Sequence, residues 1–378
     1  MRAMNFDFGE KENSLLSNLS ALFGREATES LKRLESRDIR QARESLLEWI
    51  KRLGQAGYFD LGLEDGKNSV ALVASRETVA AFAPSLFLSV EVSVRLVGRL
   101  IALYGTPHQK AELLSALKEG GLIGAVGLSE TGMNLEHPLE TLAVSGKHDF
   151  LVSGEKCHVV NAPVADWIAV AGTANNRLAF FLLRPDRPGF SIGRRLPTLG
   201  YSGVPIAPLT LQNCPVSSGN TLGPFEDDEP LKKVRAWEDE ILTAASLGLM
   251  RSAYEIASDY AKTHKSGGKP IIAYQEVGFK LAEMLTLLQT ARLLAYRSAW
   301  MTETGDSEAE TLTHCAKVFC TESAEKLASA SMQVLGQHGY TQGNPAEEGY
   351  RNAKYLQIAG TSTEISRVKI GDGVLERG

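Results

Sequence analysis

The apolar pattern changes twice along this chain, and that order limits the folds it can adopt. From about Ser14 to Lys118, apolar residues recur at helical spacing, as in Leu47, Ile50 and Leu53. Between about residues 121 and 227 the pattern becomes short β-rich runs, such as DWIAVAG and LAFFLLRP, separated by Gly, Pro, Asn and Asp. A helical region followed by a small β region is therefore expected.

From Leu231 onward, amphipathic patterns return that are longer than typical strands, for example YQEVGFKLAEMLTLLQTARLLAYRSAWM. Their lengths suit a helical bundle. We therefore predict an α+β protein with three parts. These are an N-terminal helical domain over residues 1–120, a middle β domain over residues 121–229 and a C-terminal four-helix-bundle domain over residues 230–378.

Composition narrows the classes of function. The 378 residues, 43% of them hydrophobic, suffice for two or three domains, and the net charge of -5 gives no general reason to bind nucleic acid or an anionic membrane. The four cysteines lack metal-ligand spacing, so we expect reduced thiols and no metal. The charged N-terminus argues against a signal peptide, and no run reaches the roughly 18 apolar residues of a membrane helix. We expect a cytoplasmic protein.

One C-terminal segment has a distinctive order of glycines, aromatics and polar residues. It runs from Gln333 to Arg367 as QVLGQHGYTQGNPAEEGYRNAKYLQIAGTSTEISR and resembles the C-terminal signature of the acyl-CoA dehydrogenases. LYGTPHQKAELLSALKEGGLIGAVGLSETG, GEKCHVVNAPVADW and LGLMRSAYEIASDYAKTHKSGGKPIIAYQ resemble other family segments, in the same order. The resemblance covers nearly the whole chain and implies the acyl-CoA dehydrogenase fold.

The resemblance implies an activity: FAD-dependent α,β-dehydrogenation of an acyl thioester carried by CoA or by acyl-carrier protein. In the family a buried carboxylate of raised pKa removes the α-proton, while a hydride leaves the β-carbon for the flavin. The family also implies a role in fatty acid metabolism and an electron-transfer flavoprotein as acceptor. FAD sites built across subunits imply a homodimer or homotetramer.

The family's usual catalytic Glu is replaced here by Gly360, which keeps the backbone N–H that can polarise the thioester oxygen. The isovaleryl-CoA and long-chain branches instead carry the base on the first long helix after the β domain. Counting back from LGLM, the matching position is Glu238, and Asp239 stands where many relatives have Arg. An alternative is that these acidic residues occupy the first turn of a helix, where they favour the helix dipole.

Other positions match the family's flavin contacts. Leu128 and Ser129 fall at the pyrimidine edge, His158 stands where Trp or Phe lies against the isoalloxazine, and Val160 replaces the Thr or Ser that approaches N5. Ser362 and Glu364 match the end of the signature that meets the FAD, and Leu135 matches the Ser that binds pyrophosphate. SGGKP lacks the spacing of a phosphate loop, so we expect a turn between helices.

A further set matches the contacts made to a neighbouring subunit's FAD. His264 and Gly267 replace the family's Arg-x-x-Phe, which removes a cation suited to phosphate. Gln333 and Gly336 match the Gln-x-x-Gly-Gly loop, whereas Gln337 departs from its second Gly. His158 and His264 could instead be structural histidines. The departures leave open an FAD-poor or catalytically degenerate partner subunit of a hetero-oligomer.

Overall fold

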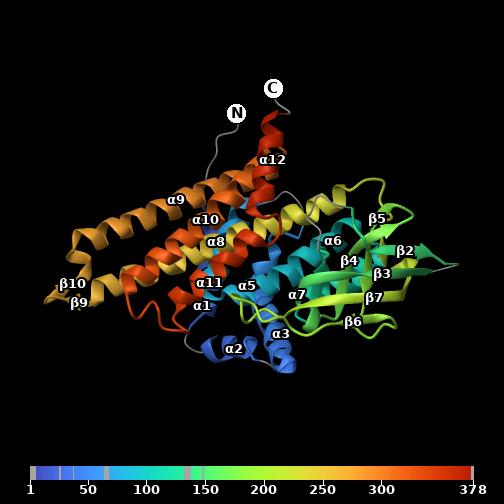
Figure 1. The fold of residues 1–378 in the computed structure, drawn as a ribbon, viewed down its shortest axis with the longest axis horizontal. Helices are drawn as coiled ribbons and strands as arrows, with labels where there is room; N and C mark the ends of the chain where they lie inside the picture. The colour runs from blue at the N-terminus through green and yellow to red at the C-terminus, as the bar shows by residue number, and fades with distance from the viewer. Residues whose placement is uncertain are drawn as a thin grey trace.

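The computed structural model describes residues 6–24, 27–36, 38–63, 68–131, 138–146 and 149–375. Helices come first along the chain, a mixed sheet follows, and long helices complete it (Figure 1). The sheet lies at one end of the molecule and the long helices extend to the other. The predicted fold class is confirmed.

The N-terminal helices are short except for α3, and two stretches of them are buried, residues 71–80 and 86–101. They are α1 (Glu10–Leu22), α2 (Ala27–Leu34), α3 (Ile39–Gln55), α4 (Ser69–Phe82), α5 (Pro84–Val90), α6 (Val97–Tyr104) and α7 (Pro107–Lys118). A π-helical segment, Glu91–Leu96, continues α5 into α6. A capping box between Thr106 and Gln109 begins α7, with Pro107 at its first position.

The described part of the sheet contains eight strands. They are β1 (Gly124–Gly127), β2 (Leu142–Ser145), β3 (Asp149–Val160), β4 (Trp167–Ala174), β5 (Arg177–Leu183), β6 (Phe190–Ile192), β7 (Ile206–Ser217) and β8 (Thr221–Leu222). The order is β6-β7-β3-β2-β4-β5-β8, and β1 pairs with β4 in parallel. The long antiparallel pair β3–β7 shifts register between Lys156 and Val159.

The C-terminal helices are α8 (Glu229–Thr263), α9 (Gln275–Thr304), α10 (Ala309–Leu335), α11 (Pro345–Ile358) and α12 (Thr363–Leu375). A small hairpin, β9 (Lys265–Ser266) and β10 (Lys269–Pro270), links α8 to α9 at the end of the bundle away from the sheet (Figure 1). Gly267 and Gly268 both have positive φ, as a two-residue hairpin turn requires. The SGGKP segment is therefore a turn between helices, as expected.

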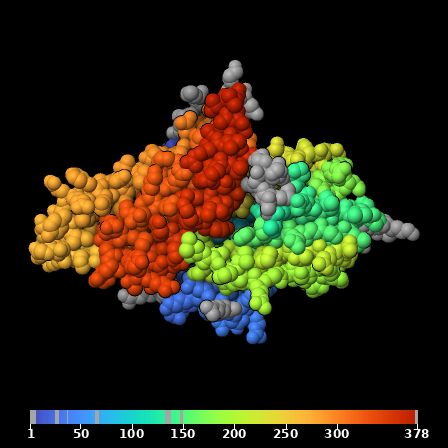
Figure 2. All heavy atoms as spheres, in the orientation of Figure 1, coloured from blue at the N-terminus to red at the C-terminus, as the bar shows by residue number. Residues whose placement is uncertain are grey.

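Helix α8 is central because it contacts both helical parts. Residues 71–80 of α4 are all buried, and α4 packs along α8. A Cβ on Gly248 of α8 would lie 2.5 Å from Ala80 Cβ, so this glycine allows the close approach. The sheet has a second core of its own. Figure 2 shows the C-terminal segment (red) between the rest of the bundle (orange) and the sheet (green).

No helix in the described ranges is long and apolar enough to cross a membrane.

Candidate active site

Glu238 lies well inside α8. The helix begins at Glu229, nine residues earlier, so Glu238, Asp239 and Glu240 lie beyond its first turn. The alternative that they are first-turn residues is therefore wrong, and the helix dipole does not account for them. Asp239 is fully buried, whereas Glu238 and Glu240 are partly buried.

Gly360 packs directly against this part of α8. It lies between α11 and α12 with φ +63°, and a Cβ placed on it would lie 3.5 Å from Glu238 Cγ. The same Cβ would lie 2.9 Å from Leu242 Cδ1 and 2.6 Å from Asp239 Oδ1. A side chain at position 360 would be both strained and obstructed. The structure thus brings Gly360 and Glu238 together and leaves no space for a catalytic Glu at 360.

A buried ion pair holds the Gly360 loop on α8. Asp239 Oδ1 accepts hydrogen bonds from Thr361 N–H at 2.9 Å and from Lys317 Nζ on α10 at 3.4 Å. Lys317 Nζ also donates to the Ala359 carbonyl at 2.8 Å. Residues 359 and 361 are therefore fixed from both sides of Gly360. Asp239, at the position where many relatives have Arg, has a structural role here.

The surroundings of Glu238 favour its protonated form. Burial, and then the negative charge of Asp239, raise the pKa of Glu238 to about 7, while Lys317 and Arg235 limit the rise. A carboxylate with a pKa near neutrality is a far stronger base than one in water, yet is substantially ionised at pH 7.

The backbone N–H of Gly360 is available to a ligand. Thr361 N–H is occupied by Asp239 and Ala359 N–H by the Tyr355 carbonyl. Within the described ranges Gly360 N–H donates no hydrogen bond. A free, partly exposed donor beside a carboxylate can stabilise negative charge on a carbonyl oxygen while the carboxylate removes a neighbouring proton.

The end of β1 and the bulge in β3 carry Ser129 and His158, the predicted flavin contacts on the sheet. Cys157 N–H donates to the Ser129 carbonyl at 2.9 Å, which joins the two segments. His158 lies in the bulge with φ +52° and an exposed side chain. The Ser129 side chain is also exposed, and its hydroxyl has no hydrogen-bond partner among the residues that the structure describes.

A buried ion pair supports these exposed groups. Glu130 Oε1 accepts from Lys156 Nζ at 2.5 Å and from the Thr141 hydroxyl at 2.6 Å, and Lys156 Nζ also reaches the Leu128 carbonyl at 3.3 Å. Burial, with a smaller contribution from Arg235, lowers the pKa of Lys156 to about 8 despite the neighbouring Glu130. The positive charge of Arg235 thus lowers the pKa of Lys156 on the sheet and also the pKa of Glu238 on α8.

The sequence agrees with known families over both the sheet and the C-terminal helices. Residues 125–214 match the acyl-CoA dehydrogenase middle domain and residues 240–375 the acyl-CoA dehydrogenase C-terminal domain. The chain is 29% identical to benzylmalonyl-CoA dehydrogenase of Aromatoleum aromaticum over 337 residues, covering 86% of this chain and 89% of the relative. The chain belongs to the acyl-CoA dehydrogenase family. Its members are FAD-dependent oxidoreductases.

Solved structures have the same fold. Butyryl-CoA dehydrogenase from Megasphaera elsdenii superposes with a TM-score of 0.88 at 23% identity, covering 98% of this chain and 100% of that one. The prolyl acyl carrier protein oxidase AnaB superposes with a TM-score of 0.85 at 21% identity, covering 97% of this chain and 100% of that one. At these identities the likeness establishes the fold of the acyl-CoA dehydrogenases and nothing about substrate.

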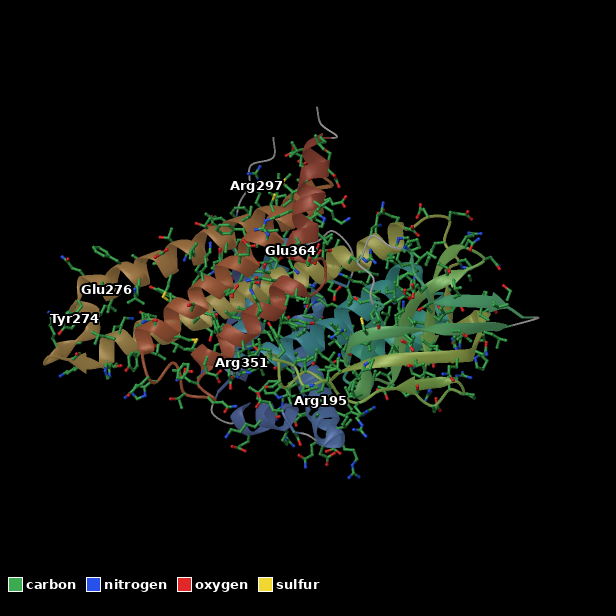
Figure 3. All side chains as sticks on the ribbon, viewed as in Figure 1. Arg195, Tyr274, Glu276, Arg297, Arg351 and Glu364 are labelled. Atoms are coloured by element: carbon green, nitrogen blue, oxygen red, sulfur yellow. The ribbon has the colours of Figure 1, made fainter. Side chains whose placement is uncertain are left out.

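The family signature ends at the start of α12. Ser362 Oγ accepts from Ile365 N–H at 3.4 Å, which makes Ser362 the N-cap, and Glu364 is exposed in the first turn (Figure 3). Its own backbone N–H, and then the Ser362 and Thr363 hydroxyls, lower the pKa of Glu364. Capping does not bury the Glu364 carboxylate, so it stays accessible to a ligand.

The second predicted set lies at the far end of the bundle, around β9 and β10 (Figure 1). His264 stacks on Tyr260 with ring centroids 4.6 Å apart, and His338 meets His264 edge-on at 6.2 Å. Gln333, Gly336 and Gln337 lie exposed at the end of α10. The chain does not bring this set to Glu238, so any contact with the same FAD must come from another subunit.

The groups at both ends can be compared with the chemistry of FAD. On the sheet side, the Ser129 hydroxyl and the projecting His158 ring suit the polar edge and the face of a flavin. Val160 is 8% exposed and offers no hydrogen bond there. At the far end, exposed Lys265 adjoins His264 and keeps positive charge where Arg is lost. The residues fit FAD, with weaker contacts than the family pattern. Leu135 lies outside the described residues.

Residues that sequence reasoning missed act through tertiary contacts. Lys317 appears in the sequence as one more polar residue of an amphipathic helix, and Arg235 as one of several basic residues in KKVRAWEDE. The signal for a buried cation was the position of Lys317 on the apolar face of the predicted helix, next to Ala316 and one turn before Cys320. No local pattern indicated its partner Asp239, 78 residues away.

Proposed function

We propose that this protein is an FAD-dependent α,β-dehydrogenase of an acyl thioester, carried by CoA or acyl-carrier protein, with Glu238 as the catalytic base. One observation carries the proposal: Glu238 Cγ lies 3.5 Å from where a Gly360 Cβ would stand. The position that usually holds the base in the family and the position used by its other branches are thus neighbours in space. A base moved to α8 still faces the same thioester.

The chain's own groups would perform the proton transfer. Glu238 takes the proton from the carbon α to the thioester carbonyl, and its pKa of about 7 makes the transfer favourable near neutral pH. The Gly360 N–H hydrogen-bonds the thioester oxygen as negative charge develops. The Asp239–Lys317 pair holds that N–H in position. Arg235 and Lys317 keep Glu238 partly ionised.

We assign the flavin contacts to two groups of residues. Leu128, Ser129, His158, Val160, Ser362 and Glu364 would meet the FAD of their own subunit. His264, Gly267, Gln333, Gly336 and Gln337 would meet the FAD of a neighbouring one. The chemistry that FAD supplies when bound is acceptance of the hydride from the β-carbon. An electron-transfer flavoprotein is the proposed acceptor.

The residues assigned to a neighbouring subunit's FAD can act only in an oligomer, and the surface of α9 suits contact with another subunit. Phe279 and Leu293 on α9 are 71% and 58% exposed. Large exposed apolar side chains on a bundle face favour contact with another subunit. We propose a homodimer or homotetramer. The buried, apolar Val160 and the stacked His264 favour one competing function, an FAD-poor subunit completed by a different partner chain.

The visible spectrum of the purified chain separates the two. An active dehydrogenase shows a flavin band and converts an acyl thioester to its enoyl form, lighter by two hydrogens. Glu238→Gln keeps the band and loses the product. A colourless chain that FAD does not reconstitute overturns the single-chain function and supports the partner-subunit alternative.

A further inference from the structure

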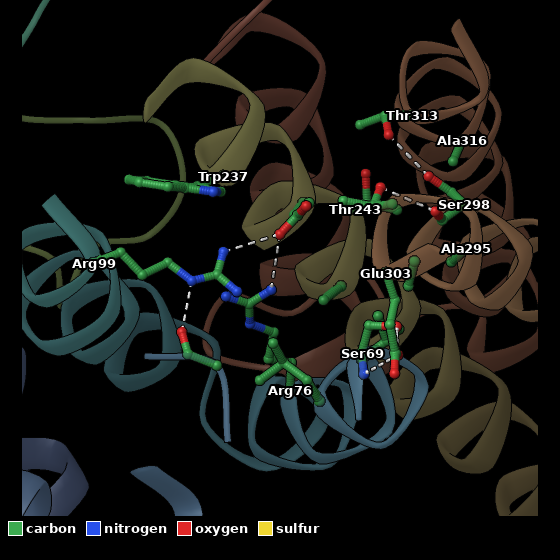
Figure 4. A pocket seen from close by; sticks show the side chains of 17 residues that line it. Ser69, Arg76, Arg99, Trp237, Thr243, Ala295, Ser298, Glu303, Thr313 and Ala316 are labelled. Carbon is green, nitrogen blue, oxygen red and sulfur yellow. Dashed lines mark hydrogen bonds and ion pairs between the residues drawn. The ribbon is translucent and has the colours of Figure 1, made fainter. Parts of the chain in front are cut away.

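A cavity of about 70 Å³ lies among α4, α6, α8, α9 and α10 (Figure 4). Part of its wall belongs to the same turn of α8 as the proposed base, because Trp237 and Glu240 line the cavity and lie one residue before and two residues after Glu238. Apolar and hydroxyl side chains form much of the rest, including Ala295, Ala299, Ser298 and Thr313. Because one water needs about 10–15 Å³ by the same measure, the cavity has room for a small molecule.

Arg76 projects into this cavity with its hydrogen-bonding capacity largely unused. The side chain is 1% exposed, and its Nε donates to Glu91 at 2.6 Å. Nη1 lies 3.7 Å from Glu240 Oε2, beyond hydrogen-bond distance. Nη2 is buried without a partner among the described residues. A buried donor of a charged group is costly to leave without a hydrogen bond, so Arg76 favours an acceptor bound in this cavity.

A second arginine faces the same cavity. Arg99 Nε donates to the Gly62 carbonyl at 2.6 Å, and Arg99 Nη1 to Glu240 at 3.2 Å. Its guanidinium lies 5.5 Å from the Trp237 ring centroid (Figure 4). Arg76 and Arg99 thus approach one carboxylate, Glu240, from two sides. Of the two, Arg76 keeps a buried donor, Nη2, without a partner among the described residues.

The ion-pair cluster around Arg76 has one cation in excess. Arg76, Arg95 and Arg99 contribute +3, and Glu91 and Glu240 contribute -2, giving +1 for these five side chains. Glu303 also lines the cavity, at its partly exposed rim, and its charge brings the sum for all six side chains to zero. Its Oε2 is held by the Ser69 N–H at 2.9 Å and the Ser69 hydroxyl at 2.6 Å, so it does not serve Arg76.

We propose that this cavity binds the carboxylate of a small organic acid, with Arg76 as its principal ligand and Arg99 beside it. Two parallel N–H donors on a planar guanidinium match a carboxylate. The alanine walls suit a short carbon chain next to it. Larger anions such as nucleotides exceed the space.

The carboxylate could belong to a free acid or to the far end of the acyl chain. A neighbouring cavity of about 220 Å³ has Glu240, Thr302 and Thr313 in common with this one and extends to Asp239 and Thr361, beside Gly360. The acyl-chain source rests on the proposed function. Binding of a free acid does not, because it needs neither flavin nor turnover.

Titration of the purified holoprotein with sodium butyrate and sodium glutarate, followed by calorimetry and by tryptophan emission, tests the proposal. We expect saturable binding of at least one acid, with an emission change that Trp237→Phe abolishes. Arg76→Lys, which keeps the charge and removes the fork, weakens binding at least tenfold. Ala299→Leu fills the cavity without changing a charged residue and should abolish binding. It tests the proposal independently if Arg76→Lys does not fold. Ala282→Leu is the matched control on the exposed side of α9 and leaves binding unchanged.

Absence of saturable binding overturns the proposal. Binding that survives Ala299→Leu, or an equal effect of sodium chloride at the same ionic strength, also overturns it. The two sources are then distinguished with butyryl-CoA and glutaryl-CoA. A higher kcat/KM for glutaryl-CoA that disappears in Arg76→Lys assigns the carboxylate to the acyl chain, whereas free-acid binding without that preference assigns it to a separate ligand. If both thioesters are inert while the acids still bind, the proposed function fails and this proposal stands.

Discussion

Glu238 on α8 packs against Gly360, which follows α11. Glu238 Cγ lies 3.5 Å from the position of a Cβ on Gly360, although the two residues are 122 positions apart in the sequence. Position 360 has positive φ, and Asp239 and Leu242 fill the space around it. Position 360 therefore has no room for a Glu side chain, and this is why we propose that the base lies on α8.

The pH dependence of activity should report Glu238. Because the base acts as a carboxylate and its pKa is about 7, kcat/KM should fall about tenfold per unit as the pH drops below about 7, and level off above it. Asp239→Asn removes a negative charge that raises this pKa, so the acidic limb should move to lower pH. Asp259→Asn, an exposed change on the same helix, is the control. An unmoved limb in Asp239→Asn would contradict the assignment.

Glu238 should reduce stability at alkaline pH. Its pKa is raised from 4.5 to about 7 in the folded chain, so the folded state favours the protonated form. That stabilisation is complete below pH 4.5 and is lost as the pH rises through 7. Allowing for partial exposure, Glu238→Gln should stabilise the protein by about 1–2 kcal/mol at pH 8 and by little at pH 5. Thermal unfolding at both pH values measures this, and an equal gain in Glu255→Gln would argue against it.

Gly360→Ala should be destabilising. The methyl group would lie 2.6 Å from Asp239 Oδ1, and φ is +63°. Strain and the displaced Asp239 together should cost about 1–3 kcal/mol and lower turnover, because the Gly360 N–H shifts. Gly371→Ala in α12 has open space around its Cβ and should be neutral or stabilising. Similar unfolding temperatures for the two variants would contradict the packing described for Gly360.

His264→Arg should strengthen FAD retention if the far end of the bundle meets a neighbour's FAD. An arginine restores a fixed cation and a fork for phosphate, worth about 1.5–3 kcal/mol per charged hydrogen bond, or roughly tenfold or more in Kd. Flavin content after dialysis measures the effect. His108→Arg, exposed on α7, controls for added charge. Unchanged retention would indicate that His264 has no flavin contact.

The sequence predicted the order of helical and sheet regions because each has its own apolar period. It also singled out Glu238 as the candidate base by counting from LGLM, and the structure places both on one continuous helix. The burial of Asp239 with Lys317 could not be predicted, because it depends on the packing of α8 against α10. Likewise Arg99 interrupts an apolar stripe, and only the tertiary structure shows Glu240, the carboxylate on α8 that pairs with it.

The rate of flavin bleaching under anaerobic single-turnover conditions is the sharpest test of Glu238 as the base. Wild-type protein and Glu238→Gln, loaded with equal FAD, are mixed with excess acyl-CoA and followed at the flavin band. We expect a rate lower by about 10²–10⁴-fold in Glu238→Gln, with FAD binding unchanged. Bleaching of Glu238→Gln within a few-fold of the wild-type rate would show that Glu238 is not the base.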